Sequence, residues 1–214
     1  MDEVEPTQRQ RGDLGPALIG AALDLLADEG VDALSLRGVA RRVGVSAMAP
    51  YRYFPDKAAL LAAVARRGFE ALGAAMRAAA AVDDPREALV GIGLAYVTYA
   101  LDNPALFRMM FGSRCQSSDP ELRAVRDATY AVLSDAVTRA YPHAEHDALI
   151  LGCWSLTHGL ASLFLDGRLS DRTSDSSTEV AERVSRAMLA LREPETAPKS
   201  AECLHLRRVR TGEP

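Results

Sequence analysis

Cationic and phenolic side chains gather in one short stretch, residues 35 to 57, of a chain that is acidic overall. The stretch holds five cations, Arg37, Arg41, Arg42, Arg52 and Lys57, against the single anion Asp56, so its net charge is +4, whereas the 214 residues together carry −4. Tyr51 and Tyr53 add hydroxyl donors. Lys57 opens a predicted helix, where a cation is unfavourable against the helix dipole unless an anion also binds there. These residues predict a local binding site for phosphate groups.

Short helices joined by a glycine turn must position these side chains. Ser35 is predicted to cap a two-turn helix over 36–42, and the chain then turns at Gly44. An earlier helix over 14–29 shows an apolar stripe of leucine and alanine and ends at Gly30. Together with a third helix after the turn, these segments predict a helix-turn-helix unit.

The third helix is predicted over residues 47–53, with Ser46 as its cap. Pro50 lies in its first turn, where the missing N–H costs less than in a helix interior. A helix this short is sufficient if only its first turn enters a groove of double-stranded DNA. Its far end carries the two tyrosine hydroxyls. The predicted unit therefore resembles a domain that binds double-stranded DNA.

Residues 10 to 62 resemble the N-terminal signature of the TetR family of transcriptional regulators. The signature reads here as DEG at the end of the first helix, LSLRGVARRVGVS across the turn, and YRYFPDK after it. Two residues depart from the family pattern: Tyr53 stands where histidine is usual, and Pro50 where an aliphatic residue is more common. Tyrosine also donates to phosphate, so the first departure keeps the chemistry.

The resemblance implies residue roles in binding operator DNA. Ser35, Tyr51, Tyr53 and Lys57 would hold phosphates, Arg37, Ala47 and Met48 would face base edges, and Ser46 would cap the reading helix. Ala47 and Met48 can only touch thymine methyl groups or exclude water. Arg37 is therefore the expected guanine reader, with Arg52 as a second candidate.

The rest of the chain also predicts helices, so the fold class is all-α. Alanine and leucine recur at three- and four-residue spacing, and aromatic residues make up only 6% of the chain. Asp84-Pro85, Asn103-Pro104 and Asp119-Pro120 each place a capping side chain before proline at the first helical position. Helices are predicted over 57–80, 85–101, 104–112, 120–140, 144–166 and 178–192. We expect a flexible arm over 1–13, the helix-turn-helix domain over 14–56, a ligand-binding and dimerisation domain over 57–192 and a disordered tail over 193–214.

The segment 151–167, LGCWSLTHGLASLFLDG, is apolar on almost every side and must be buried on almost every side. Gly152, Ser155, Gly159 and Leu163 share one face, which permits close approach of another helix. In TetR proteins the last two helices pair with their copies in a second subunit, so the resemblance implies that this face forms a homodimer.

A cavity lined by aromatic residues is predicted for a small-molecule effector. The candidate lining residues are Phe69, Tyr96, Tyr99, Phe107, Met110, Phe111, Tyr130, Trp154 and His158. Trp154 and His158 also match a tryptophan-x-x-x-His-Gly signature of one branch of TetR C-terminal domains. His158 has two interpretations, a core histidine bonded to a backbone carbonyl or a residue that faces the ligand. No carboxylate is obviously directed inward, which favours a neutral or weakly polar ligand.

Several function classes are disfavoured by the sequence. Three widely spaced cysteines without C-x-x-C fit neither a disulfide framework nor a thiolate zinc site. His143 and His146 crowd a helix start, so a solvated turn is preferred to a metal site, and we expect no metal and no cofactor. No export signal, membrane span or catalytic motif is found, which predicts a cytoplasmic protein that is not an enzyme. The alternative is a helical small-molecule-binding protein or enzyme with a vestigial helix-turn-helix unit.

Overall fold

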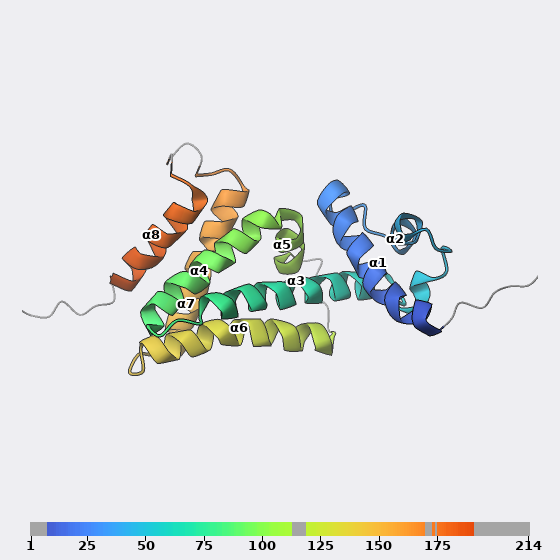
Figure 1. Cartoon of the computed structure of the whole chain (residues 1–214). Coiled ribbons are helices and arrows are strands. Elements are labelled where there is room, and N and C mark those ends of the chain that lie inside the picture. Colours follow the sequence, from blue (N-terminus) through green and yellow to red (C-terminus); the bar gives the residue numbers. More distant parts are fainter. Residues whose placement is uncertain (1–7, 113–118, 170–172, 174, 191–214) are drawn as a thin grey trace, which may run out of the picture.

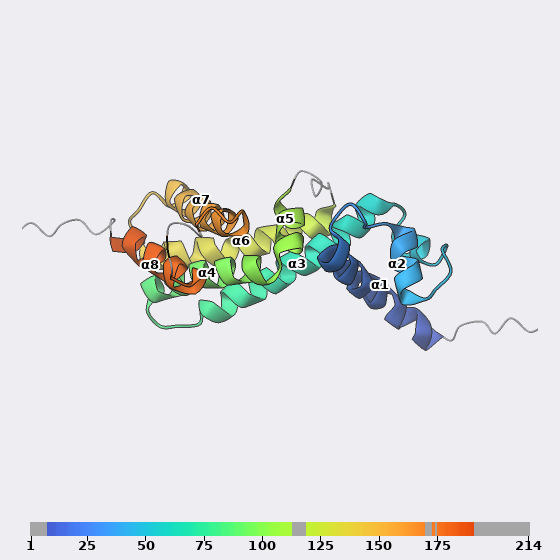
Figure 2. The same ribbon diagram turned by 90° about the horizontal axis from the view of Figure 1, so that it is seen from above.

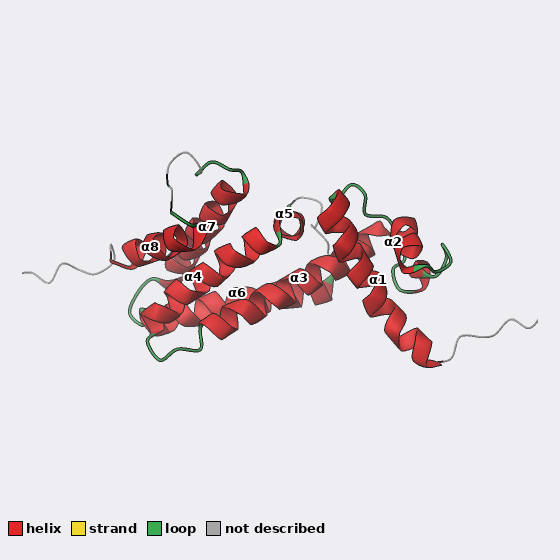
Figure 3. Cartoon of the chain, turned by 45° about the horizontal axis from the view of Figure 1, so that its top comes forward, coloured by secondary structure: helices red, strands yellow, loops and turns green. Residues whose placement is uncertain are grey.

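The computed structural model describes residues 8–112, 119–169, 173 and 175–190, and every regular element within them is helical (Figure 1, Figure 3). The all-α prediction is confirmed. The elements are α1 (Gln8–Glu29), α2 (Leu36–Val43), the 3-10 helix η1 (Pro50–Arg52), α3 (Lys57–Ala79), α4 (Pro85–Asp102), α5 (Pro104–Phe111), α6 (Pro120–Ala140), α7 (His146–Leu165) and α8 (Ser177–Ala190). The predicted disordered tail, 193–214, lies outside the described residues.

A small lobe is formed by α1, α2, η1 and the first turns of α3 (Figure 1). Its core is built from fully buried leucine and valine side chains, among them Leu18, Val39 and Leu60. The predicted cap is confirmed, because Ser35 Oγ accepts a hydrogen bond from the N–H of Gly38 at 3.0 Å. Gly44 ends α2 with φ of +80°, a conformation that glycine adopts without steric cost.

The predicted reading helix over 47–53 is wrong in form. The chain makes a turn over 47–49 and then a single 3-10 turn, because Pro50 has no N–H to donate to the Ser46 carbonyl, as an α-helix would require. The N–H of Ala49 donates to that carbonyl instead, at 2.9 Å. The 3-10 helix starts after Ala49, which makes no side-chain cap, so Ser46 is not its cap.

Two other boundaries differ from the sequence prediction. Helix α1 begins at Gln8, inside the segment 1–13 that the sequence predicts to be a flexible arm. Asn103 does not cap α5; its side-chain amide donates to the carbonyl of Tyr99 at 3.1 Å and so closes the end of α4. Asp84 and Asp119 cap α4 and α6 as predicted.

Helix α3 connects the small lobe to a larger one made of α4, α6, α7 and α8 (Figures 1 and 2). Along its length α3 packs against α6 and α4, while α4 in turn packs against α7 and α8. Helices α7 and α8 make few contacts with each other, so the space between them is not closed by direct packing. The short helix α5 contacts both α1 and α3, which makes it a second link between the lobes.

Candidate functional site

A hollow of about 430 Å³ lies in the small lobe where the N-termini of α2 and α3 face the same space. Four of the residues predicted to bind DNA line it: Ser35, Arg37, Tyr51 and Lys57. Helix N-termini present free N–H groups and a positive dipole end. The charged lining consists of two cations and Asp56, whose carboxylate is engaged in capping α3 through the N–H of Ala59 at 2.8 Å. The hollow is therefore suited to an anion.

The other predicted DNA-binding residues lie outside the hollow but on the surface. Ser46, Ala47, Met48, Arg52 and Tyr53 are all exposed, and Met48 leaves 69% of its surface accessible, an unusual exposure for a large apolar side chain. The ring of Tyr53 passes close to α1, because a Cβ added at Gly15 would lie 3.3 Å from it. All nine predicted residues thus remain accessible to a partner.

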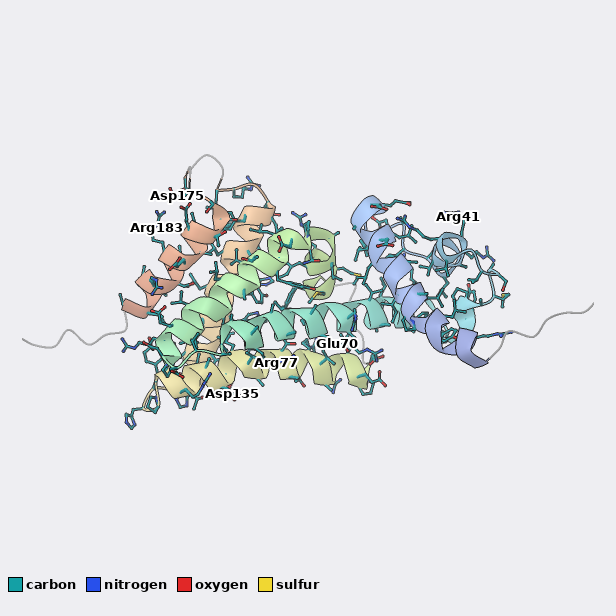
Figure 4. All side chains as sticks on the ribbon, in the orientation of Figure 1. Arg41, Glu70, Arg77, Asp135, Asp175 and Arg183 are labelled. Carbon is teal, nitrogen blue, oxygen red and sulfur yellow. The ribbon has the colours of Figure 1, made fainter. Side chains whose placement is uncertain are left out.

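Not every cation of the basic stretch is available. Arg42 forms an ion pair with Asp28 of α1, and this hydrogen bond raises the pKa of the guanidinium. The charge count over residues 35 to 57 missed Asp28 because it belongs to the preceding helix. Arg41, by contrast, is exposed on α2 (Figure 4). The basic surface is consequently weaker than the sequence count implied.

The larger lobe encloses a cavity of about 510 Å³ between α3, α4, α5, α6, α7 and α8. Six of the nine predicted lining residues do line it: Phe69, Tyr96, Met110, Phe111, Tyr130 and Trp154. Tyr130 and Met188 line the cavity and each leave 41% of their surface exposed, so the cavity reaches the surface at α6 and at α8. The predicted aromatic cavity exists, although with a partly different lining.

Tyr99, Phe107 and His158 do not line the cavity. Tyr99 is buried and donates its hydroxyl to the carbonyl of Gly68 at 3.0 Å, which joins α4 to α3, and burial raises its pKa to about 12. Phe107 stacks on the ring of His158, with ring centroids 5.4 Å apart. Both rings lie behind the cavity wall and support it.

His158 has a partner that neither sequence interpretation named. Its Nδ1 lies 2.8 Å from the hydroxyl of Tyr96, a residue 62 positions earlier in the chain. Burial lowers the pKa of His158 and raises that of Tyr96, so both groups are kept neutral. A histidine–tyrosine pair therefore fixes one aromatic wall of the cavity.

Sequence reasoning missed the aliphatic and hydroxyl parts of the lining. These residues include Leu72 and Met76 on α3, Thr129 and Leu133 on α6, Thr157 on α7, and Ser185 and Met188 on α8. A usable signal existed on two helices, because Phe69, Leu72 and Met76, like Thr129 and Leu133, recur at helical spacing. The same signal was present on α8, where Ser185, Met188 and Leu189 are spaced i, i+3 and i+4.

The face of α7 predicted to form a dimer is uncovered in the single chain. Leu151 and Leu163 leave 53% and 45% of their surface exposed, and Gly152 and Ser155 are also exposed. A Cβ built at Gly152 or Gly159 would meet nothing within 4 Å. By length and composition alone α7 is also apolar enough to cross a membrane, although such a helix is weak evidence for one. An uncovered apolar face of this kind commonly marks an interaction surface.

Comparison with family models identifies both lobes. Residues 18–64 match the model described as bacterial regulatory proteins, tetR family, and residues 89–188 match one described as tetracyclin repressor-like, C-terminal domain. The first match contains the hollow, and the second contains α7 and most of the cavity lining. The second description does not specify the tryptophan-x-x-x-His-Gly branch.

Individual relatives agree with these matches. An uncharacterized HTH-type transcriptional regulator of Mycobacterium bovis, Mb2274c, is 36% identical over 80 residues, which is 37% of this chain and 41% of that protein. A solved structure of a protein of unknown function from Rhodococcus sp. RHA1 superposes with a TM-score of 0.76 at 29% identity, covering 86% of this chain and 98% of that one. The TetR family transcriptional regulator PfmR from Thermus thermophilus shares the fold, with a TM-score of 0.62 at 24% identity, over 86% of this chain and 97% of its own.

Proposed function

The chain belongs to the TetR family of transcriptional regulators, and from this we propose that it is a homodimeric repressor that leaves its operator when a small apolar molecule fills the cavity. The observation that carries the proposal is that one continuous helix, α3, joins a hollow lined by Arg37 and Lys57 to a largely apolar cavity. Lys57 opens that helix in the hollow, and Phe69, Leu72 and Met76 lie in the cavity wall.

The hollow supports phosphate binding in the proposed complex. Ser35, Tyr51 and Lys57 would hold phosphates where the two helix N-termini meet, and Tyr53 would donate to a neighbouring one. Arg37 is exposed at the start of α2 and is the proposed guanine reader, with Arg52 as the second candidate. Ala47 and Met48, in the exposed turn before η1, would contact thymine methyl groups.

The domain division and the assembly are part of the same proposal. The DNA-binding unit ends near residue 56, and the helices from 57 to the end of α8 hold ligand and form the dimer. Gly152, Ser155, Gly159 and Leu163 would meet their copies across the interface, because their face is open in the single chain. A DNA-bound regulator of this kind acts in the cytoplasm, and neither catalysis nor a cofactor is required. Membership of the tryptophan-x-x-x-His-Gly branch stays a prediction.

Gel mobility shift with the DNA upstream of the protein's own gene tests the proposal. We expect Lys57→Ala to weaken binding to operator and scrambled DNA alike, and to reduce the slope of log K against log salt by about 0.9, as for one lost phosphate contact. Arg37→Ala should instead reduce the preference for operator, at a cost of about 1–3 kcal/mol per half-site.

Arg77→Ala is the matched control, because Arg77 is an exposed cation near the other end of the same helix. It should leave both affinities unchanged. Wild-type protein that binds operator no better than scrambled DNA would refute the proposed function.

A further inference from the structure

We propose, on the basis of the proposed function, that the effector is a compact, neutral molecule built on fused or linked rings and carrying a hydroxyl donor, rather than a straight-chain lipid. The shape of the cavity, its aromatic walls, its lack of net charge and the hydrogen bonds of its threonines each contribute to this assignment.

The dimensions of the cavity favour a broad ligand. On α3 the lining residues run from Phe69 to Met76 and on α4 from Leu89 to Tyr96, which at 1.5 Å per residue is about 10.5 Å in each case. For a cavity as long as these two lining segments, a volume of about 510 Å³ corresponds to a mean width of about 8 Å. A single file of methylene groups is only about 4 Å across, the contact distance between carbon atoms. An extended chain would leave much of the wall without contact.

Aromatic side chains from five helices contribute to the cavity wall. Phe111 lies 5.3 Å from Phe69 and 6.1 Å from Tyr96, measured between ring centroids, at the end nearer the small lobe. Tyr130 and Trp154 form an edge-to-face pair at 6.0 Å. Aromatic side chains in tilted and edge-to-face arrangements present both ring faces and ring edges, which another ring fits better than a saturated chain does.

Charge argues for a neutral ligand. Among the described residues that line the cavity, Arg126 and Asp127 are the charged ones, and both are exposed on α6. Their opposite charges leave the cavity without a net charge, and burial keeps Tyr96 in the cavity wall and its partner His158 behind that wall neutral. An ionised carboxylate inside the cavity would lose its hydration without gaining a buried cation.

The threonine hydroxyls favour a hydrogen-bond donor on the ligand. Thr129 Oγ1 lies 3.0 and 2.9 Å from the carbonyls of Phe69 and Val125, which share its single hydrogen, and Thr157 donates to the carbonyl of Cys153 at 2.9 Å. Each hydroxyl has one hydrogen, and that hydrogen is already donated to a backbone carbonyl. Towards a ligand the hydroxyl oxygen can therefore only accept a hydrogen bond. A ligand group that meets these oxygens must donate, as a hydroxyl does.

Quenching of Trp154 fluorescence measures the binding of aromatic probes directly, because this is the only tryptophan in the chain and it lines the cavity. The aromatic probes are 9-phenanthrol and its methyl ether 9-methoxyphenanthrene. The third probe is 1-tetradecanol, a straight-chain alcohol with the same number of carbons as 9-phenanthrol, and its binding is measured as the recovery of Trp154 fluorescence when it displaces 9-phenanthrol. We expect 9-phenanthrol to bind at least about tenfold more tightly than 1-tetradecanol, and its methyl ether about three- to tenfold more weakly than 9-phenanthrol itself.

Thr157→Val should remove that preference for the phenol over the ether. Thr138→Val is the matched control, because Thr138 makes the same bond to the carbonyl four residues back, to Ser134 at 2.9 Å, outside the cavity. Tighter binding of 1-tetradecanol than of 9-phenanthrol would overturn the assigned shape, and equal binding of phenol and ether would overturn the assigned donor. All titrations are made without DNA, so their failure is distinct from a failure to bind operator.

Discussion

Replacing Gly68 by alanine is expected to displace α5 from α3. Gly68 lies where α3 and α5 approach closely, and a Cβ at this position would overlap Met110 Sδ and lie 3.3 Å from a methyl group of Leu106. Met110 is buried, with the hydroxyl of Tyr99 3.9 Å from its sulfur, and the free space beside it is the cavity that it lines. The added methyl group must therefore turn the Met110 side chain into the cavity or push on the helix that carries Met110 and Phe111.

Two opposing terms set the magnitude. Overpacking a well-filled core costs about 1–3 kcal/mol, while alanine in place of glycine within a helix gains about 0.5–1 kcal/mol. The net loss for Gly68→Ala is about 0–2 kcal/mol, because methionine is adaptable and absorbs part of the strain. Gly20→Ala in α1 is the matched control: its Cβ would meet nothing within 4 Å, so only the favourable helix term of about 0.5–1 kcal/mol remains.

Thermal and urea unfolding of both variants measure this difference. For a chain of this size 1 kcal/mol corresponds to about 2–4 °C in Tm, so Gly68→Ala should unfold at a lower temperature than wild type and Gly20→Ala at a higher one. Replacing Met110 by alanine as well should make the Gly68 change less costly than it is alone. If Gly68→Ala stabilises the protein as much as Gly20→Ala does, the close approach of α5 and α3 is not a packing constraint.

Two further predictions concern the dimer and pH. Gly152→Leu should leave the fold of each chain intact, because a Cβ at this position meets nothing within 4 Å in the single chain. In analytical ultracentrifugation this variant should shift towards monomer. Ala124→Leu, at an exposed position of α6, is the control and should stay dimeric. A fully dimeric Gly152→Leu would exclude this interface. Burial lowers the pKa of His158 in the folded chain, so the unfolded chain binds the proton first, and the free energy of unfolding should fall as pH drops below about 6.5. His158→Gln should flatten that slope in urea unfolding between pH 7.5 and 5.5, and an unchanged slope would assign it to other groups.

The helix starts were predictable where they depend on residues that are close together in the sequence. Ser35, Asp84 and Asp119 cap the helices that follow them, because a cap depends on neighbours within three residues. Pro50 is tolerated near a helix start, but its missing N–H is the one that the first α-helical bond needs, so a 3-10 turn forms instead. The Asn103 side chain could cap the helix that follows it or bond to the end of the helix before it, and the neighbouring residues did not distinguish these two roles.

The cavity was less predictable, because its lining comes from six helices whose register is set by packing. Aromatic residues identified α3, α4, α5, α6 and the middle of α7, yet Phe107 lies behind the wall and stacks on His158. The bond between His158 and Tyr96 joins positions 62 residues apart, and no local pattern indicates such a pair. In the same way Asp28 neutralises Arg42 from another helix, which a charge count along the chain cannot detect.

The link between the two lobes constrains how a ligand could act on DNA. Lys57 and Phe69 lie on one unbroken helix, about 18 Å apart at 1.5 Å per residue, so α3 cannot shift at the cavity without moving the hollow. Helix α5 adds a second connection, since it contacts α1 while Met110 and Phe111 line the cavity. Two connections oppose independent bending of the lobes, so a ligand that pushed α3 and α5 apart at the cavity would also have to displace the small lobe. Such a ligand releases DNA only if it binds the displaced arrangement better, and by reciprocity operator DNA must then weaken ligand binding by the same factor, typically about five- to 150-fold.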